Sequence, residues 1–409
     1  MKFKKTIGFL HLWLGLTSGL IVFIVAITGC IYVFSDEITH AVRADAMHVK
    51  KVAGAQYLPV RTLWESTQRK VGSKLRLDGL DVSNDSHKSW SFSSFQAGDP
   101  EAITYFGSID HYKTVYVNPY TGAIQGVYDE ERDFFNIVKF LHWSLLLHTD
   151  YGQPIVGWST FIFVVMLITG MILWWPRSRN AVKQRFSFRW KKTTGRKRKN
   201  YDLHNILGFY FSFVLLIVAF TGMVWSFSWF QAIVYVAASG TVTPPERIEV
   251  QSVPGEKVMH DPLQLALDQT RDAHPTASAF RIYPAADSIA ALQIYVQQHE
   301  GVYYVAHEMQ FDQYTGKLLS RRDHADKNFG EKVITANYDI HVGAILGIPG
   351  KILAFLASLV CASLPVTGFL IWKNRKKKKA GTVRKSQSQI RKLKTTGSIV
   401  HTVPVAEKV

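Results

Sequence analysis

Four of the fifteen histidines recur at matching positions in the two halves of the chain. His11 and His204 each open a His-x-x-Leu-Gly motif, 193 residues apart, while His142 and His341 each precede a later apolar segment. An ionisable side chain at a membrane boundary is costly and usually functional. Two imidazoles that face each other suit axial ligation of a haem iron. The pattern therefore predicts two b-type haems, one between His11 and His204 and one between His142 and His341.

Gly15 and Gly208 follow the first two histidines by four residues, so each lies on the same helical face as its histidine. We expect them to leave room for the porphyrin. A competing interpretation treats the histidines as caps or interfacial residues, with glycine serving close helix packing. Zinc fits less well because no nearby Cys or carboxylate completes a tetrahedral set. His148, six residues after His142 near the end of the same expected short helix, is an alternative ligand at the second site.

Four apolar windows must position these histidines, and each is long enough to cross about 30 Å of hydrocarbon as a helix. The windows cover residues 7–34, 155–175, 206–230 and 352–372. Each window contains a Thr-Gly pair near its end: Thr28-Gly29, Thr169-Gly170, Thr221-Gly222 and Thr367-Gly368. Both cysteines, Cys30 and Cys361, fall inside the windows, so we expect no disulfide framework.

The net charge of +17 is concentrated in three short segments. Three lysines precede the first window, residues 176–200 carry eleven Lys or Arg and no acid, and the tail from residue 373 carries twelve with one acid. The positive-inside rule places these segments, and both termini, on the cytoplasmic side. Attraction to anionic membrane lipid accounts for the charge, and no nucleic-acid role is expected.

The repeated motifs predict a tandem duplication of helix, outward domain and helix, with both copies in one orientation about an axis along the membrane normal. Residues 115–124 (VYVNPYTGAI) and 309–318 (MQFDQYTGKL) repeat a Tyr-Thr-Gly turn. Amphipathic helices at 60–71 and 262–274, followed by alternating strands, predict outward α+β modules. The expected division is 1–34, N-terminus and first span; 35–153, outward domain with an interfacial helix at 133–148; 154–175, second span; 176–202, basic loop; 203–230, third span; 231–349, outward domain; 350–372, fourth span; and 373–409, basic tail.

Several stretches together resemble the PepSY-associated transmembrane family, which includes bacterial inner-membrane ferric-siderophore reductases and iron-regulated membrane proteins. The similar stretches are residues 11–15, 141–142 with 145–146, 168–176 (ITGMILWWP), 202–208, and 340–350 with 365–372. The two Tyr-Thr-Gly turns resemble the turn of PepSY domains. The resemblance implies a polytopic α-helical protein with two haems, two periplasmic PepSY-like domains and electron transfer outward from the cytoplasm. His148 and the Lys-rich tail depart from the family pattern.

Haem irons with histidine at both axial positions carry electrons rather than bind substrate. The chain contains neither a GxGxxG fingerprint nor a Walker motif, so the electron donor is expected to be a separate cytoplasmic component or a quinol. The expected function is reduction of a ferric siderophore or other ferric chelate at the inner membrane. Two alternatives stay open: a quinol-linked cytochrome that serves a periplasmic partner protein, and a haem-free PepSY scaffold or regulator in iron uptake. No catalytic residue is predicted.

Overall fold

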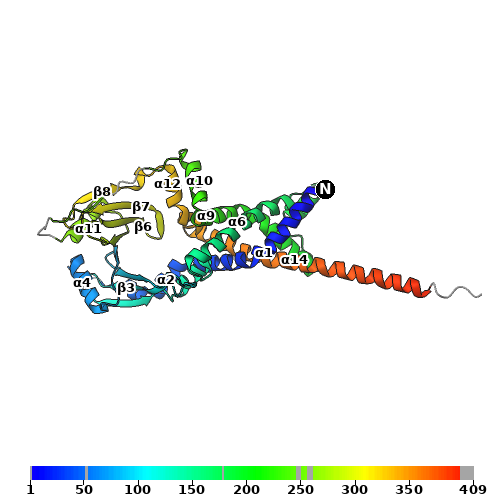
Figure 1. Ribbon diagram of the computed structural model, residues 1–409, viewed down its shortest axis with the longest axis horizontal. Coiled ribbons are helices and arrows are strands. Elements are labelled where there is room, and N and C mark those ends of the chain that lie inside the picture. Colours follow the sequence, from blue (N-terminus) through cyan, green and yellow to red (C-terminus); the bar gives the residue numbers. More distant parts are fainter. Residues whose placement is uncertain (1, 51–53, 177–178, 246–249, 256–260, 397–409) are drawn as a thin grey trace, which may run out of the picture.

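The computed structural model describes residues 2–50, 54–176, 179–245, 250–255 and 261–396, with the backbone alone described at 2, 179–181 and 376–396. A bundle of helices forms the centre of an elongated molecule (Figure 1). A β-sheet lies at one end, here called the sheet end, and the N-terminus lies at the other, here called the basic end, where the long helix α14 projects (Figure 1). The last part of the expected basic tail, 397–409, lies outside the described residues.

Four helical segments among the described residues are long and apolar enough to cross a membrane, which confirms the four predicted spans. They are Phe3–Tyr32, Thr149–Trp174, Arg196–Ser226 and Ala344–Arg375. The helices that build them are α1 (Lys2–Tyr32), α6 (Thr149–Trp174), α8 (Arg196–Asp202) with the π-helix η1 (Leu203–Leu207) and α9 (Gly208–Ser226), and η3 (Ala344–Leu346) with α14 (Gly347–Thr396). The third span ends four residues before the predicted limit because Phe227 has an extended backbone.

Helix α1 contacts both α6 and α14, and α9 likewise contacts both α6 and α14. Small residues permit the close approach: Ala357 is fully buried at the centre, and a Cβ on Gly19 would lie 3.5 Å from Pro365. Small residues at such contacts are typical of helix packing in membranes, where van der Waals contact replaces the hydrophobic effect between helices.

The sheet is a single antiparallel layer of eight strands in the order β4-β3-β2-β1-β5-β6-β7-β8. The strands are β1 (Gly79–Ser83), β2 (Trp90–Ala97), β3 (Ile109–Val117), β4 (Ile124–Asp129), β5 (Ala279–Tyr283), β6 (Leu292–His299), β7 (Val302–Phe311) and β8 (Leu318–Arg322). The sequence predicted two separate modules, whereas the structure joins them where Leu80 pairs with Ile282. Arg281 also donates to both carboxylate oxygens of Asp81 across this junction, at 2.6 and 2.5 Å.

Helices α4 (Val60–Val71) and α11 (Pro262–Ala273) occupy the positions predicted for the two amphipathic helices, and both pack on the core of the sheet. Leu63 and Leu267 are fully buried against strand residues such as Phe92 and Phe280. Each fully buried Leu or Phe contributes about 1.5–3 kcal/mol through removal of apolar surface from water. This shared core fixes both halves of the sheet as one body.

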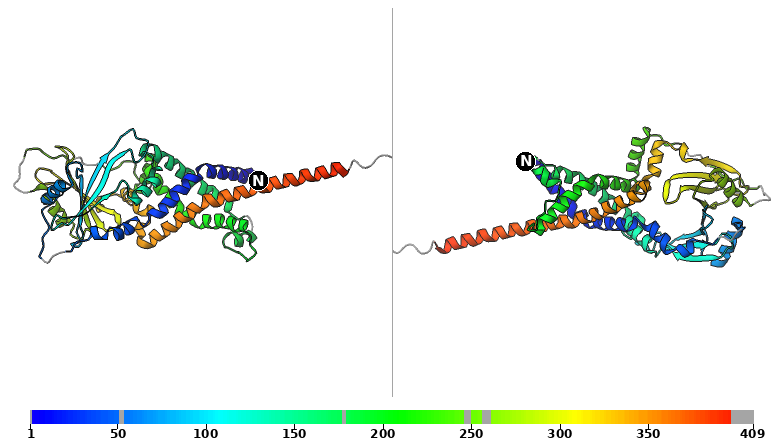
Figure 2. Two further views of the ribbon diagram at one scale, coloured as in Figure 1. Left: turned by 90° about the horizontal axis from the view of Figure 1, so that it is seen from below. Right: turned by 180° about the vertical axis from the view of Figure 1, so that it is seen from behind.

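Short helices connect the sheet to the bundle (Figure 2). They are α2 (Ser35–Val42), α3 (Ala44–Met47), α5 (Phe134–Ser144), α10 (Ser228–Ser239), η2 (His324–Asp326), α12 (Phe329–Thr335) and α13 (Asn337–His341), and α7 (Arg179–Arg185) precedes α8. The interfacial helix predicted at 133–148 is shorter in the structure. It ends at Ser144 because Leu145 and Leu146 adopt left-handed backbone angles, with φ of 58° and 59°.

Candidate functional site

The four predicted histidines meet as two pairs. The ring centroids of His11 and His204 lie 6.5 Å apart, with an angle of 83° between the ring planes. Those of His142 and His341 lie 6.1 Å apart, with an angle of 75°. The structure therefore brings together the same partners that the sequence repeats paired.

The two pairs lie near opposite ends of the bundle. His11 is on α1 and faces the π-helical turn η1 that carries His204, a distortion that is frequent at functional sites. His142 is on α5 and His341 ends α13, both at the sheet end. His142 contacts Thr28, and the 17 residues from His11 to Thr28 correspond to about 26 Å of helix.

Each histidine is held by the Thr-Gly pair of the other span in its own half. The threonine Oγ1 lies within hydrogen-bond distance of the histidine Nδ1 in all four cases. The contacts are Thr169 with His11 at 3.0 Å, Thr28 with His142 at 3.2 Å, Thr367 with His204 at 2.9 Å and Thr221 with His341 at 2.8 Å.

These contacts determine which ring nitrogen carries the proton. The Nδ1 of His142 also lies 2.8 Å from the carbonyl oxygen of Val25, and that of His341 lies 3.1 Å from that of Val218. A carbonyl accepts only, so Nδ1 is the donor and Nε2 keeps its lone pair. His11 and His204 make the equivalent backbone contacts, with Met166 and Leu364. In all four cases this leaves Nε2 available to bind a metal.

The glycine of each Thr-Gly pair lets the imidazole approach the helix. A Cβ added to Gly29 would lie 3.1 Å from Cε1 of His142, and one added to Gly222 would lie 3.7 Å from Cε1 of His341. The corresponding distances are 3.2 Å from Gly170 to His11 and 3.3 Å from Gly368 to His204. The sequence interpretation noted the four Thr-Gly pairs as markers of repetition but missed this role, for which their recurrence was the signal.

Gly15 and Gly208 lie against side chains of neighbouring helices. A Cβ on Gly15 would lie 2.7 Å from the terminal methyl of Met166, and one on Gly208 would lie 3.4 Å from a methyl of Leu364. Both contacts involve the far ends of flexible side chains. The role of these glycines in clearing space for a porphyrin stays a prediction.

The spacing within each pair fits a metal ion between the rings. Two imidazoles on opposite sides of one metal have centroids about 6.3 Å apart, given metal–nitrogen distances of about 2 Å and C–N bonds near 1.33 Å. The observed 6.5 and 6.1 Å lie on either side of this value. Burial lowers the pKa of His142 and that of His341, the latter to about 3, so both imidazoles are neutral, as metal ligation requires.

Residues that sequence reasoning missed hold the short helices in place. Buried Arg43 donates to Glu130 at 2.5 Å and to Asp133 at 2.9 Å, and Asp133 caps the helix that carries His142. Asn337, four residues before His341, donates its amide to the carbonyl oxygen of Thr221 at 3.0 Å.

His148 does not belong to the helix that carries His142. It caps α6, where its Nδ1 accepts from the backbone amide of Asp150 at 3.3 Å. The ring that faces His341 is that of His142. The prediction that placed both histidines on one helix is wrong, because Leu145 and Leu146 adopt left-handed angles that end α5 before His148 is reached.

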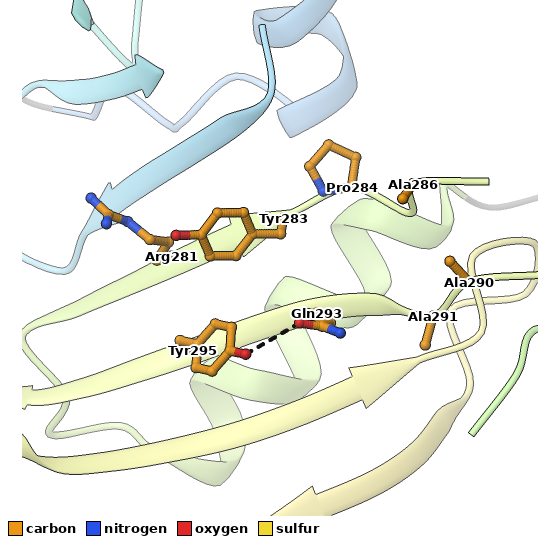
Figure 3. Close-up of a pocket in the computed structure, with 8 residues that line it drawn as sticks. All are labelled: Arg281, Tyr283, Pro284, Ala286, Ala290, Ala291, Gln293 and Tyr295. Carbon is orange, nitrogen blue, oxygen red and sulfur yellow. Dashed lines mark hydrogen bonds between the residues drawn. The ribbon is translucent and has the colours of Figure 1, made fainter. Parts of the chain in front are cut away.

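A shallow hollow of about 550 Å³ lies on the second half of the sheet (Figure 3). Tyr283 and Tyr295 line it, and the Tyr295 hydroxyl donates to Gln293 at 3.2 Å (Figure 3). Arg281, which pairs with Asp81, lies at its margin. The hollow offers aromatic faces to a ligand, while the guanidinium at its margin is already paired with Asp81.

Comparison with protein families gives a match over residues 9–375 to the family described as the PepSY-associated TM region. This match covers all four histidines, all four Thr-Gly pairs and the whole sheet. Comparison with curated proteins gives no match.

Proposed function

Because the chain belongs to the PepSY-associated transmembrane family, we propose that it carries electrons across the bacterial inner membrane through two b-type haems and reduces the iron of a ferric siderophore or other ferric chelate. The observation that carries this proposal is the presence of two facing histidine pairs near opposite ends of the bundle. His11 with His204 would hold one haem, and His142 with His341 the other.

When bound, each haem would accept and release single electrons. The protein's part would be to hold the four histidines in place. A threonine hydroxyl and a backbone carbonyl orient each imidazole and keep the proton on Nδ1, so that Nε2 points away from these two groups. A haem held by two histidines would have no position left for oxygen or substrate, which favours electron transfer over ligand activation.

The proposed orientation follows from charge. Lys and Arg are concentrated in the basic loop and near both termini, so these segments of the proposed tandem duplication would lie in the cytoplasm. The sheet then lies in the periplasm as two fused PepSY-like halves. A separate cytoplasmic component or a quinol would supply electrons at the basic end.

Aromatic side chains connect the sheet-end pair with exposed surface. The ring of Trp225 lies 5.3 Å from that of His341 and 6.5 Å from that of Tyr338. Tyr303, which is 45% exposed, lies 5.4 Å from Tyr338. A ferric chelate that docks near Tyr303 would receive its electron there. Reduction to Fe(II) weakens binding by hard oxygen donors and would release the metal.

The test uses the full-length protein, purified and placed in lipid nanodiscs. We expect two haems per chain and a sharp low-spin b-type α band in the reduced state. Ferric hydroxamate or catecholate chelates should then reoxidise the dithionite-reduced protein, with Fe(II) trapped by a ferrous chelator. The His142→Ala/His341→Ala protein is the control and should reduce the chelates much more slowly.

Two other outcomes separate the alternatives. A two-haem protein that is reduced by quinol but is not reoxidised by ferric chelates would favour a membrane cytochrome that serves a periplasmic partner protein. A colourless protein that remains folded and takes up no haem would contradict the proposal and favour a scaffold or regulator.

A further inference from the structure

A second cluster of metal-binding side chains lies in the second half of the sheet. His274 follows the last residue of α11, His307 is on β7, and Asp323 follows the end of β8. One potential ligand atom from each residue lies within 4.8 Å of the other two. The cluster thus joins one helix to two strands of the same half.

The distances within the cluster match those around a coordinated metal ion. The Nε2 of His274 lies 3.3 Å from Oδ1 of Asp323, and the Nδ1 of His307 lies 3.0 Å from the same oxygen. Metal–ligand bonds of about 2.0–2.1 Å place neighbouring ligand atoms about 2.8–3.0 Å apart in octahedral geometry and about 3.3–3.4 Å apart in tetrahedral geometry.

His274 has an unsatisfied nitrogen that faces the cluster. Its side chain is 7% exposed, and its Nε2 has no hydrogen-bond partner among the described residues, although Asp323 is close. A buried polar atom without a partner costs about 1–3 kcal/mol. A cation between Nε2 and Oδ1 would remove that cost.

His307 provides a second nitrogen with a lone pair. Its Nδ1 lies 3.0 Å from Oδ1 of Asp323 and 3.3 Å from the backbone amide of His324. The carboxylate requires a proton on Nδ1 and the amide requires a lone pair there, so one tautomer satisfies only one of these neighbours. In the tautomer with the lone pair on Nδ1, a bound cation would take the place of the long contact with the amide and would lie between Nδ1 and Oδ1.

Asp323 keeps one oxygen for the cluster. Arg321 contacts the other oxygen, Oδ2, at 2.9 and 2.8 Å. Two contacts between the Arg321 guanidinium and Oδ2 favour the ionised carboxylate of Asp323. Its side chain is 25% exposed, which leaves the cluster open to solvent on one side.

We propose that His274, His307 and Asp323 bind one divalent first-row transition-metal ion. Two imidazoles and a carboxylate are ligands that Zn²⁺ and Fe²⁺ accept, whereas Mg²⁺ and Ca²⁺ prefer oxygen alone. Water would complete the coordination. The ion links the end of α11 to β7 and β8, and this proposal does not depend on haem binding.

The first half of the sheet has a different arrangement at the corresponding positions. Lys113 and Asp129 precede His307 and Asp323 by 194 residues each, and they form an ion pair at 3.0 Å. Gly72, which follows α4 as His274 follows α11, has φ of 83°, which disfavours any side chain. The lysine ammonium supplies the charge that a metal ion would supply in the second half.

The test is a titration of the full-length protein, purified without a polyhistidine tag and freed of metal with a chelator. Isothermal titration with Zn²⁺ should reveal a site that excess Mg²⁺ does not displace and that requires the residues of the cluster. His307→Lys, which installs the ion pair of the first half, should weaken this binding at least tenfold, and so should His274→Gln. His299→Ala removes an exposed histidine of the same half and should bind as the unchanged protein does.

Thermal unfolding shows whether each variant remains folded. Zn²⁺ should raise the unfolding midpoint of the unchanged protein and of His299→Ala, but not that of His307→Lys. Zn²⁺ binding of unchanged affinity in both folded cluster variants would overturn the proposal. Failure of the unchanged protein to bind Zn²⁺ at millimolar concentration would overturn it as well, whatever the haem content.

Discussion

The two halves of the bundle hold their histidines through the same contacts but support those contacts differently. In both halves a threonine hydroxyl and a backbone group contact each Nδ1. In the second half an asparagine four residues before the histidine also donates to the carbonyl oxygen of that threonine, from Asn200 to Thr367 and from Asn337 to Thr221. The first half has Ile7 and Val138 at these positions. The orientation of the histidine rings therefore depends on the Thr-Gly pairs, and the asparagines add support in one half only.

The two halves of the sheet differ in a similar way. At corresponding positions, the first half has the Lys113–Asp129 ion pair and the second half has the His307–Asp323 pair. The ion pair is complete without a ligand, whereas the second-half cluster leaves Nε2 of His274 without a hydrogen bond among the described residues. Of the two halves of the sheet, only the second therefore has the side chains for the proposed metal ion.

The largest expected effect comes from removal of one of the proposed axial ligands. His11→Ala and His204→Ala should each abolish the basic-end haem and leave the sheet-end haem, because the two rings face one another 6.5 Å apart. Haem content should fall from two to about one per chain, measured by pyridine haemochrome against protein concentration. Loss of both haems from either single change, in a protein that elutes as a folded species, would contradict the pairing.

The next effect concerns the glycines and differs between the halves. Gly29→Ala would place a Cβ 3.1 Å from the ring of His142, whereas Gly222→Ala would place one 3.7 Å from the ring of His341. The first contact is tighter than most real Cβ contacts and forces the ring to move. We expect Gly29→Ala to lose most of the sheet-end haem and Gly222→Ala to retain it, as read from the α band. Equal loss in both variants would show that the glycines act on helix packing instead.

Much of the architecture was readable from the sequence because it depends on local signals. Runs of apolar residues predicted the four spans, and the amphipathic period predicted α4 at Val60–Val71 without error in its bounds. The end of α5 was not predicted, because left-handed angles at Leu145 and Leu146 carry no sequence signature: both are apolar residues without the flexibility of glycine.

Long-range features were less readable. The junction of β1 with β5 pairs Leu80 with Ile282, two residues about 200 positions apart, and alternation alone does not choose a partner for an edge strand. The histidine pairs were predicted because repetition implies symmetry. The contacts between the Thr-Gly pairs and the histidines were not predicted. They depend on which helices cross and on the level along each helix at which they cross, and the hydrophobic period of a single helix determines neither.

A smaller effect should follow from removal of one threonine hydroxyl. Thr28→Val keeps the shape of the side chain but removes the oxygen 3.2 Å from Nδ1 of His142, while the Val25 carbonyl still accepts from that nitrogen. Changes to groups that orient a metal ligand weaken metal binding by about 10–100-fold. Because the Val25 carbonyl still orients the His142 ring, we expect haem binding to weaken by a factor near the lower limit of this range. Haem transfer to apomyoglobin measures the effect. Thr17→Val, an exposed position on the same helix, is the matched control and should leave the rate unchanged.

The smallest effect tests the asparagine support itself. Asn337→Leu removes the amide that donates to the Thr221 carbonyl at 3.0 Å, without touching the His341 ring contacts. Loss of one buried hydrogen bond costs about 1 kcal/mol, so sheet-end haem dissociation should accelerate only a few-fold. Val138→Leu changes the equivalent first-half position, which makes no such bond, and should have less effect on haem release. If Asn337→Leu released haem as fast as His341→Ala, the asparagine would be part of the ligand set rather than its support. The two halves would then differ in how they bind haem, and not only in how firmly they hold the histidines.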